Sequence, residues 1–451
     1  MPGSQFSGIP LDLRGLKGNP LHILPVPQVR IEEVLEQRAL ELGAELRRAH
    51  EVVAFEQDGD GVTVDVHGPE GAYQVRTRYL VGADGGHSSV RRQAGIAFPG
   101  TTDEGFSALL GNAIIPESLL DPQTGLLVLP GVKVDVPLRP LTHIRLPGGI
   151  FTFAMLPPGS GVHLVAVMEW DQPPADDSVP MTFEDLRAGL RRLLGTDLPM
   201  SPAPTSGPHL LNRLSGVSSR QAETYRVGRV LLVGDAAHVH SAVGGPGLNL
   251  GMQDALNLGW KLAAELRGRA PDGLLDTYES ERAPFSRRVI MQTRAQMALM
   301  RPGSDISSAR DLLAELLEDE NNRRRIAELM AGTDVRYDLG GDGSDPLVSQ
   351  WLPDLQPHIA DGWTQIAERQ RAGRAVLVDF TEGAAVAAAA EGWRDRIDVV
   401  RAEAADQSLP LAAALVRPDG YVAWAATDGP SQQPVDDGLR EALARWFGAA
   451  G

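Results

Sequence analysis

One segment places an acidic residue at the end of an apolar run and follows it with glycines. In Val81–Arg92, Asp84 closes the run, Gly85 begins a glycine pair, and Ser88 and Arg91 come shortly afterwards. Backbone amides beside glycine, a hydroxyl and a guanidinium together favour an anion site, here for a pyrophosphate or a ribose edge. The competing interpretation is a surface turn in which the glycines only make the bend.

A second segment ends an apolar run in a Gly-Asp pair. The run Val230–Val233 leads into Gly234 and Asp235. An Asp at the carboxyl end of a strand points into the crevice where α/β sheets bind ligands, and its carboxylate accepts hydrogen bonds from ribose or ribitol hydroxyls. An Asp that caps a helix is the alternative.

A glycine-rich loop follows the Gly-Asp pair and opens a helix. The residues that we expect to contact a ligand here are Gly245, Pro246, Gly247, Leu248 and Asn249. Glycines and the free amides of a helix N-terminus form a pocket of positive potential, which suits an electron-rich carbonyl or an anionic ring. A merely flexible loop would not explain why the glycines directly follow the Gly-Asp strand.

Three histidines, His87, His238 and His240, stand inside these segments. A histidine in such a position is more often a hydrogen-bonded structural residue than an acid or base, so we name no catalytic acid or base. The chain has no cysteine, which excludes thiolate catalysis and cysteine-ligated metal, and no His/Asp/Glu cluster has ligand spacing. We therefore expect no metal site.

The elements that must position these segments change in type along the chain. Apolar residues at helical spacing predict a helix over 30–46, and strand-like runs follow at 51–55 and 61–66 and in a third run that ends at Asp84. This order is typical of the back half of an α/β nucleotide-binding domain. A buried strand over 229–234 and a helix over 248–266 return the chain to that domain.

The middle of the chain has a different texture. Short alternating apolar stretches broken by Pro-Gly pairs predict an antiparallel sheet between residues 100 and 215, with one amphipathic helix over 182–194. Such a sheet is a suitable wall for a flat ligand. Four side chains alternate on it and either line that wall or pack in the core: Phe151, Phe153, Met155 and Met168.

Length and charge limit the function classes. A chain of 451 residues is too long for one core, so we expect two or three domains. The net charge of −17 would repel a phosphate backbone, which argues against a nucleic-acid partner. The sequence has neither a run of apolar residues long enough for a membrane span nor a signal peptide, and together with the absence of cysteine this fits a cytoplasmic protein.

Taken together, the three segments resemble those of flavoprotein aromatic hydroxylases of the para-hydroxybenzoate-hydroxylase fold. Asp84, Gly85, Ser88 and Arg91 match the Asp-Gly motif that contacts both FAD and NAD(P)H in that family, and Asp235 matches the Asp that holds the FAD ribitol. The likeness covers nearly the whole chain.

Two further stretches extend the resemblance. The loop from Gly245 to Asn249 matches the one that faces the flavin pyrimidine ring, and Gln28 matches a glutamine that the family supplies to FAD. The last part of the chain resembles the thioredoxin-like appendage of actinobacterial polyketide hydroxylases. Without cysteine, that appendage cannot be a redox domain.

The resemblance implies a fold and a reaction. The fold is α/β: a doubly wound FAD/NAD(P)-binding domain, an inserted antiparallel substrate sheet and a C-terminal thioredoxin-like domain. The expected boundaries are 1–99 and 216–338 for the two parts of the FAD-binding domain, 100–215 for the substrate sheet, 339–346 for a linker and 347–451 for the last domain. The reaction is hydroxylation of an aromatic or polyketide-type small molecule by FAD, NAD(P)H and O2, through a flavin C4a-hydroperoxide. The oligomeric state stays open, with a homodimer as one alternative.

Departures from the family keep two other functions open. The G-x-G-x-x-G fingerprint and the acidic residue that should follow it are absent, so we expect the first strand–loop–helix of the FAD domain to be missing. In the loop, Ala242 and Pro246 replace a proline and a glutamine that are common in the family. The alternatives are a cyclase or other non-redox biosynthetic enzyme on the same fold, and an inactive truncated homologue.

Overall fold

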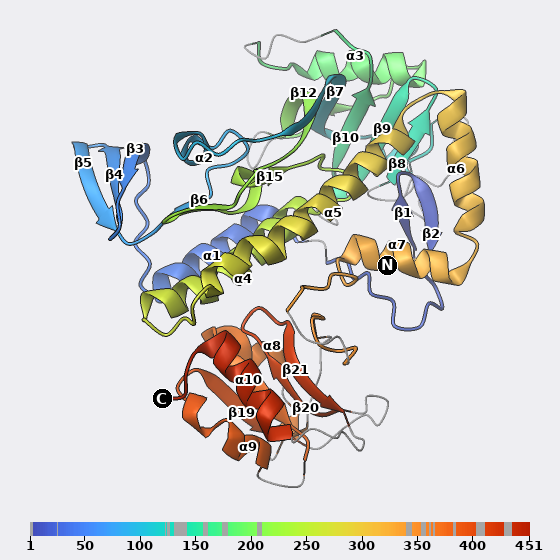
Figure 1. Ribbon diagram of the computed structural model, residues 1–451. Coiled ribbons are helices and arrows are strands. Elements are labelled where there is room, and N and C mark those ends of the chain that lie inside the picture. The colour runs from blue at the N-terminus through green and yellow to red at the C-terminus, as the bar shows by residue number, and fades with distance from the viewer. Residues whose placement is uncertain are drawn as a thin grey trace.

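The computed structural model arranges the chain in three parts, with a large sheet above, a smaller α/β unit in the middle and a C-terminal domain below (Figure 1). The residues that it describes are 3–24, 26–121, 123, 127–129, 142–156, 161–173, 179–204, 210–339, 345–352, 358–359, 362–363, 366–381, 385–402, 411–427 and 435–451. No helix in these ranges is both long and apolar enough to cross a membrane.

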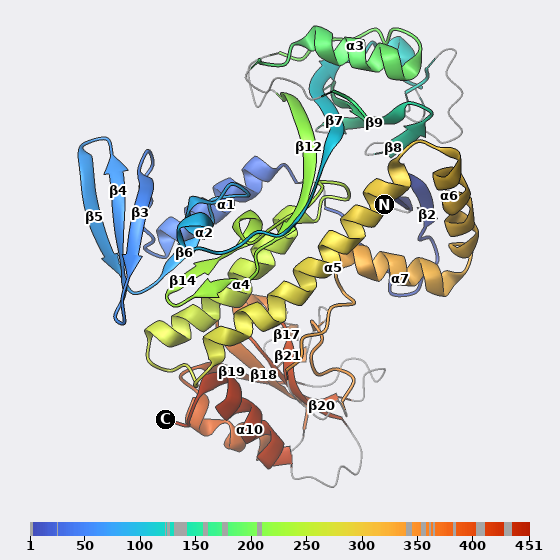
Figure 2. The same cartoon turned by 45° about the horizontal axis from the view of Figure 1, so that its top comes forward.

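The large sheet is the predicted antiparallel wall. Its strands run in the order β15-β12-β7-β10-β9-β8, and β11 adds to β7. Their bounds are β7 Gly100–Ile114, β8 Thr142–Leu146, β9 Gly149–Leu156, β10 Val162–Glu169, β11 Ser201–Pro202, β12 Leu211–Gln221 and β15 His238–Val239. Helix α3 (Phe183–Leu194) covers one face of this sheet, and the long helix α5 (Thr277–Met300) lies on the side of the other face (Figure 2).

Helix α3 begins and ends where its sequence signals it. The Thr182 hydroxyl accepts a hydrogen bond from the Asp185 amide while the Asp185 carboxylate accepts one from the Thr182 amide, a reciprocal capping box. The helix ends at Gly195, whose φ of 71° lies in the left-handed region. Its buried leucines Leu186 and Leu190 pack on the sheet. The prediction of an antiparallel sheet with an inserted helix at 182–194 is confirmed.

The α/β unit is built on a short three-stranded sheet in the order β13-β14-β6. Its strands are β13 (Arg226–Val227), β14 (Val230–Leu232) and β6 (Leu80–Gly82), and β14 and β6 run parallel. Both strands therefore end at the same edge of the sheet, where β6 leads into α2 (Ser89–Gln93) and β14 into the 3-10 turn η2 (Gly234–Ala236). Helix α4 (Gly247–Leu266) packs against that turn.

Two of the expected strands belong to a separate sheet. β3 (Glu51–Gln57), β4 (Val62–Gly68) and β5 (Gly71–Thr77) form an antiparallel meander that stands apart at one side of the molecule (Figure 1). Strand β5 was not predicted as separate from the run that ends at Asp84. Its weakly apolar alternation continues up to Thr77, and only the break before Leu80 divides it from β6.

The N-terminal segment forms a hairpin and then a helix. β1 (Gly3–Phe6) and β2 (Ile9–Asp12) pack on α6 (Ser304–Leu316) and α7 (Glu320–Ala331). Helix α1 (Gln28–Glu41) confirms the predicted helix but buries none of its residues. Its apolar side chains are about half exposed: Val29, Val34, Leu35 and Leu40.

The C-terminal domain is a four-stranded sheet in the order β19-β18-β20-β21 with helices around it. Its strands are β18 (Ala375–Asp379), β19 (Ile397–Arg401), β20 (Leu411–Val416) and β21 (Val422–Thr427), and its helical elements are α8 (Ile366–Arg369), η4 (Gln370–Ala372), α9 (Ala385–Ala389), η5 (Glu391–Trp393) and α10 (Val435–Phe447). β18 and β19 pair in parallel, and β20 and β21 pair antiparallel. Most of the expected linker, residues 340–344, lies outside the described residues.

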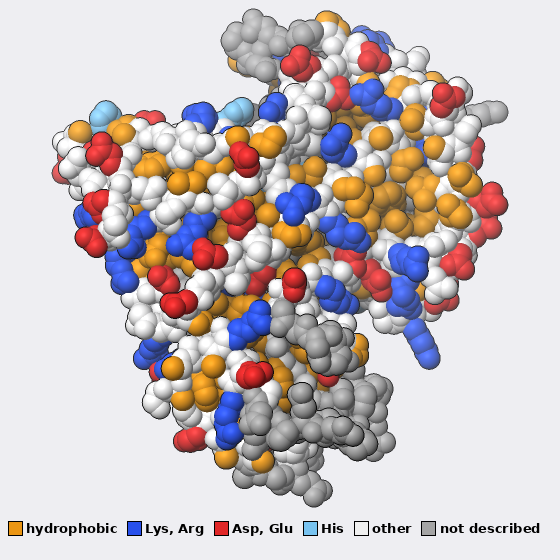
Figure 3. Space-filling view, viewed as in Figure 1, with side chains coloured by type: hydrophobic (Ala, Val, Ile, Leu, Met, Phe, Trp, Pro, Cys, Tyr) orange, Lys and Arg blue, Asp and Glu red, His pale blue; other side chains and the backbone are white. Residues whose placement is uncertain are grey.

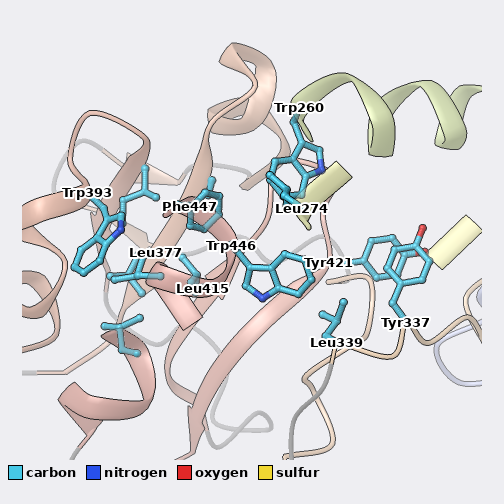
Figure 4. Packing of buried hydrophobic residues seen from close by; sticks show 14 of the residues in the cluster. Trp260, Leu274, Tyr337, Leu339, Leu377, Trp393, Leu415, Tyr421, Trp446 and Phe447 are labelled. Atoms are coloured by element: carbon cyan, nitrogen blue, oxygen red, sulfur yellow. The ribbon is translucent and has the colours of Figure 1, made fainter. Parts of the chain in front are cut away.

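One apolar core joins this domain to the α/β unit. Trp260 of α4 and Leu274 of η3 (Leu274–Asp276) lie against Trp446 and Phe447 of α10 (Figure 4). Beside them the rings of Tyr337 and Tyr421 stack with 3.8 Å between their centroids. The domain is therefore packed onto α4 rather than tethered beside it.

Candidate functional site

A cavity of about 1390 Å³ lies between the large sheet, α5 and the ends of β6 and β14. Its lining brings together parts of all three segments singled out in the sequence. From the Asp-Gly segment come Gly86, His87 and Arg91, and from the residues after the Gly-Asp pair come 239–246 and Asn249. The large sheet supplies one wall, and the segment 20–24 also lines the cavity. The volume exceeds that of a typical single-ligand site and suits two ligands side by side.

A buried carboxylate on α4 holds the Gly-Asp turn in place. The sequence did not identify this residue as part of the site. Asp254 on α4 is fully buried, and its Oδ2 accepts hydrogen bonds from the Gly234 amide at 3.1 Å and from His238 Nε2 at 2.6 Å. Its Oδ1 accepts from Arg282 Nε at 2.7 Å. Burial opposes the ionisation of Asp254, but His238 and Arg282 outweigh it and lower the pKa of this carboxyl. The turn that carries Asp235 is thus held by an ionised anchor.

Asp235 itself is exposed on η2 and does not line the cavity, whose lining in this segment begins four residues later, at Val239. Gly234 has a φ of 60°, a left-handed conformation that glycine adopts without strain. The structure therefore presents the Asp235 carboxylate outward while the backbone beneath it is fixed.

Asp84 has a different geometry from the one expected. Its carboxylate accepts hydrogen bonds from the Ser88 hydroxyl at 2.5 Å and from the amides of Ser89 and Val90 at 2.7 and 3.1 Å. Burial raises the pKa of Asp84, but these hydrogen bonds overcome that effect and the net pKa is lowered. Ser88 in turn caps α2 by accepting from the Arg91 amide. Asp84 and Ser88 thus organise the turn after β6.

Arg91 ties two of the predicted segments together. Its guanidinium donates to the Ala236 carbonyl at 2.8 Å and to the Gly86 carbonyl at 2.9 Å, and it stacks on Phe98 with 3.7 Å to the ring centroid. The side chain is buried, which lowers its pKa, yet it still lines the cavity. Arg91 was expected to bind an anion, and its side chain also links the turn after β6 to the turn after β14.

The glycine-rich loop forms the floor of the cavity. Gly244 and Gly245 have φ values of 82° and 68°, which glycine adopts without strain. Helix α4 then begins with Pro246 at its N-cap, with no side-chain cap and no acidic residue in the first turn. Its first amides therefore have no side-chain cap, and their use by a ligand stays a prediction.

In the wall opposite this loop, successive side chains along each strand point to opposite faces of the sheet. Alternate residues of β7 and β10 face the cavity, while the side chains between them pack under α3. Phe151 and Phe153 belong to the core under α3, so the alternative of core packing is correct for both, whereas Met168 lines the cavity. The side chain of Met155 lies outside the described residues.

A few polar groups interrupt this apolar wall. His143 Nδ1 lies 2.7 Å from the Thr152 hydroxyl, and both residues line the cavity. Burial lowers the pKa of His143 and, on the loop side, that of His240. Both rings are therefore neutral near pH 7 and add no charge to the cavity.

Not every predicted contact residue lies in the cavity lining. Gln28 starts α1, is exposed and donates to Glu32 Oε1 at 2.7 Å. Gly85, Gly247 and Leu248 adjoin lining residues without lining the cavity themselves.

The sequence reading also missed Gln296 on α5 and the pair of His143 and Thr152, which do line the cavity. A polar residue on a buried helix face was the available signal for Gln296. No sequence signal marks the pair of His143 and Thr152, because the two residues come together only when β8 pairs with β9.

Known families match the two ends of the chain. Residues 5–293 match the family described as FAD binding domain, and residues 345–450 match the family described as aromatic-ring hydroxylase, C-terminal. The first match alone covers more than half of the chain.

Curated relatives match the chain over nearly its whole length. A 12-dehydrotetracycline 5-monooxygenase/anhydrotetracycline 6-monooxygenase of Streptomyces rimosus is 44% identical over 99% of this chain and 85% of its own. A rifampicin monooxygenase of Streptomyces venezuelae is 40% identical over 95% of this chain and 80% of its own. A dialkyldecalin synthase of Streptomyces rugosporus is 36% identical over 99% and 84%.

A solved structure extends the likeness to the fold. The OxyS anhydrotetracycline hydroxylase from Streptomyces rimosus superposes with a TM-score of 0.82 at 41% identity, over 100% of this chain and 86% of that one.

Proposed function

The chain belongs to the FAD-dependent aromatic-ring monooxygenases, and from this premise we propose that it hydroxylates a polycyclic phenolic substrate with NAD(P)H as the reductant. The observation that carries the proposal is the cavity of about 1390 Å³, which has the glycine-rich loop on one side and an apolar wall of the large sheet on the other. A flavin ring and a flat substrate need such facing surfaces.

The residues on the loop side fit FAD. The uncapped start of α4 offers backbone amides to the carbonyl oxygens of the flavin pyrimidine ring. Gly244 and Gly245 let the backbone approach a flat ring without side chains in the way. We assign the exposed carboxylate of Asp235 to the ribityl hydroxyls, since η2 lies only four residues before Val239, where the cavity lining of this segment begins.

Arg91 and Asp84 support this assignment in different ways. Arg91 reaches the cavity and holds the Gly-Asp turn through the Ala236 carbonyl. Asp84 fixes the turn after β6 through its bonds to Ser88 and to backbone amides. In this proposal Arg91 contacts the cofactor region directly, whereas Asp84 positions the backbone around it.

Bound FAD supplies the redox chemistry: it takes two electrons from NAD(P)H and lets O2 react. In the overall reaction a ring C–H becomes C–OH, one oxygen atom of O2 enters the product, and the other leaves as water. The protein positions the ring and excludes water. Phe106, Leu110 and Leu164 give the substrate an apolar surface, and the neutral His143 beside Thr152 adds a hydrogen-bonding point.

The size and polarity of the cavity support a polycyclic substrate. The wall is mainly apolar, so affinity comes from burying a flat, largely apolar molecule rather than from charge. The tetracycline and rifampicin monooxygenases among the relatives act on large polycyclic compounds by their names, and anhydrotetracycline is the first compound to test here.

The test supplies the protein with excess FAD and either NADPH or NADH, with and without anhydrotetracycline. The proposal predicts that the aromatic compound accelerates oxidation of the nicotinamide and that a product heavier by one oxygen atom appears in the mass spectrum. Nicotinamide oxidation that yields only hydrogen peroxide with a whole panel of polycyclic phenols would reject the hydroxylase assignment.

A non-redox cyclase is the second candidate, and two observations favour keeping it. Ala242 lines the cavity where a proline was expected, and a dialkyldecalin synthase is among the relatives. A cyclase would convert a polyene into an isomer of the same mass without consuming NAD(P)H. The same mass spectrum therefore separates the two functions.

A further inference from the structure

Gln296 stands out in the cavity because a buried polar group there has no protein partner. Its side chain is 2% exposed, lies on α5 and lines the cavity. Among the residues that the structure describes, its Nε2 has no hydrogen-bond acceptor. A buried N–H without an acceptor is unfavourable, so such groups are normally satisfied by water or by a ligand. In a cavity of this size, either water or a bound ligand can supply that acceptor.

The position of the amide is fixed by its surroundings. An ideal Cβ on Gly244 would lie 3.3 Å from Gln296 Nε2, so the amide rests against the backbone of the glycine-rich loop. The next residue, Met297, and Met300 one turn of α5 further on pack with Phe106 and Val243 in a buried cluster. The amide is therefore held where the loop meets the apolar wall, and little side-chain entropy remains to be lost on binding.

We propose that Gln296 is a specificity-determining residue that donates a hydrogen bond to a carbonyl or phenolic oxygen of the substrate ring lying beside the glycine-rich loop. This inference rests on the proposed function. The donor selects molecules that carry an oxygen at that point, because a hydrocarbon of the same outline displaces water from Gln296 and leaves its N–H unpaired. It also sets which ring of a polycyclic molecule faces the loop.

The experiment measures binding of two probes of the same three-ring outline to the FAD-loaded protein. Alizarin, a dihydroxyanthraquinone, offers oxygen acceptors, and anthracene offers none. Equilibrium dialysis with optical detection gives Kd for each probe. The variants are Gln296→Leu and, as the matched control, Gln292→Leu, which removes a buried glutamine one turn earlier on α5 that does not line the cavity.

The wild type should prefer alizarin over anthracene. Gln296→Leu should weaken alizarin binding about tenfold, as expected for loss of one buried hydrogen bond, and should leave anthracene binding equal or tighter. Gln292→Leu should keep the wild-type preference. FAD affinity should be the same in all three proteins, which separates a substrate contact from a cofactor contact.

Other outcomes reject one claim or the other. An alizarin preference that survives in Gln296→Leu overturns the role of Gln296 and leaves the hydroxylase assignment intact. The role of Gln296 is also overturned if the wild type binds both probes with equal affinity, or if Gln296→Leu weakens only the binding of FAD. A wild type that binds neither probe, nor any polycyclic phenol, removes the proposed substrate class and the role of Gln296 with it.

Discussion

At the residue scale, the site depends on side chains that hold backbone rather than on side chains that reach a ligand. Asp254 is the clearest case, because one carboxylate fixes the Gly234 amide, His238 and Arg282. Arg282 also donates a hydrogen bond to the Tyr337 hydroxyl at 2.9 Å, and the Tyr337 ring stacks on Tyr421 of the C-terminal domain. The Gly-Asp turn is thus linked to the C-terminal domain by a chain of direct contacts.

Replacing Asp254 by Asn should therefore weaken both stability and FAD binding. The substitution leaves Arg282 buried without its charge partner, and breaking such a pair costs about 3–5 kcal/mol of unfolding free energy. Denaturant unfolding and a flavin titration measure the two effects. The neighbouring Asp235→Asn serves as control: this residue is exposed, so its variant should lose FAD affinity with a nearly unchanged unfolding midpoint. Equal stability of the two variants would contradict this account.

The sequence located the loops of the site but not its supports. The cavity-lining residues 244–246 and Asn249 could be found because glycines after a strand are typical of ligand-binding loops, whereas the cofactor contacts of Gly234 and Asp235 stay predictions. The partners of Asp254 could not, because Arg282 comes from α5 and approaches only when α5 packs on α4. The capping role of Asp84 was missed for a related reason: the same carboxylate serves a ligand or a helix start according to the local turn.

At the element scale, helix periodicity was the most reliable guide. The helices at 182–194 and 248–266 were predicted almost to the residue because both have amphipathic spacing and clear ends. Helices α6 and α7 are two separate elements with a short break between Leu316 and Glu320. The break comes at Asp319, whose carboxylate accepts from the amides of Asn321 and Asn322 and so starts a new helix.

Helix α1 is loosely packed against the rest of the molecule. It has no buried residue, and Leu35 is 53% exposed. Leu35→Glu should therefore change the unfolding free energy by no more than about 0.5 kcal/mol, as for other surface positions. Leu258→Glu on α4 is the control, since Leu258 is 3% exposed and belongs to a core, and it should unfold the protein or strongly destabilise it. Circular dichroism melts report both. A large loss for Leu35→Glu would show that α1 is packed.

At the scale of the whole molecule, the domains meet through charge as well as through apolar packing. Arg417 of the C-terminal domain is fully buried and donates to both oxygens of Glu281 on α5, at 2.8 and 2.7 Å. Lys261 of α4 reaches the same carboxylate at 2.8 Å, and burial lowers the pKa of this lysine to about 8. On the outer surface, by contrast, acidic and basic side chains are intermingled on the face shown in Figure 3.

This interface predicts how stability depends on pH. Burial opposes the ionisation of Glu281, but Arg417 and Lys261 outweigh it and lower its pKa below the usual 4.5. A lowered carboxyl pKa adds stability that is present above 4.5 and is lost as the pH falls through the lowered value. Glu281→Gln should be less stable than the wild type at pH 7, and the difference should shrink below pH 4.5. Thermal melts between pH 7 and pH 3 check this, and a difference that stays constant would contradict it.

The most direct test of the central claim is the fate of molecular oxygen. The protein, with excess FAD and NADPH, is incubated under 18O2 with a polycyclic phenol, and the product is analysed by mass spectrometry. As an aromatic-ring monooxygenase, it should place one labelled atom on the product, with NADPH consumed in proportion. A product that carries no label, or an isomer formed without NADPH, would contradict the claim and favour the cyclase.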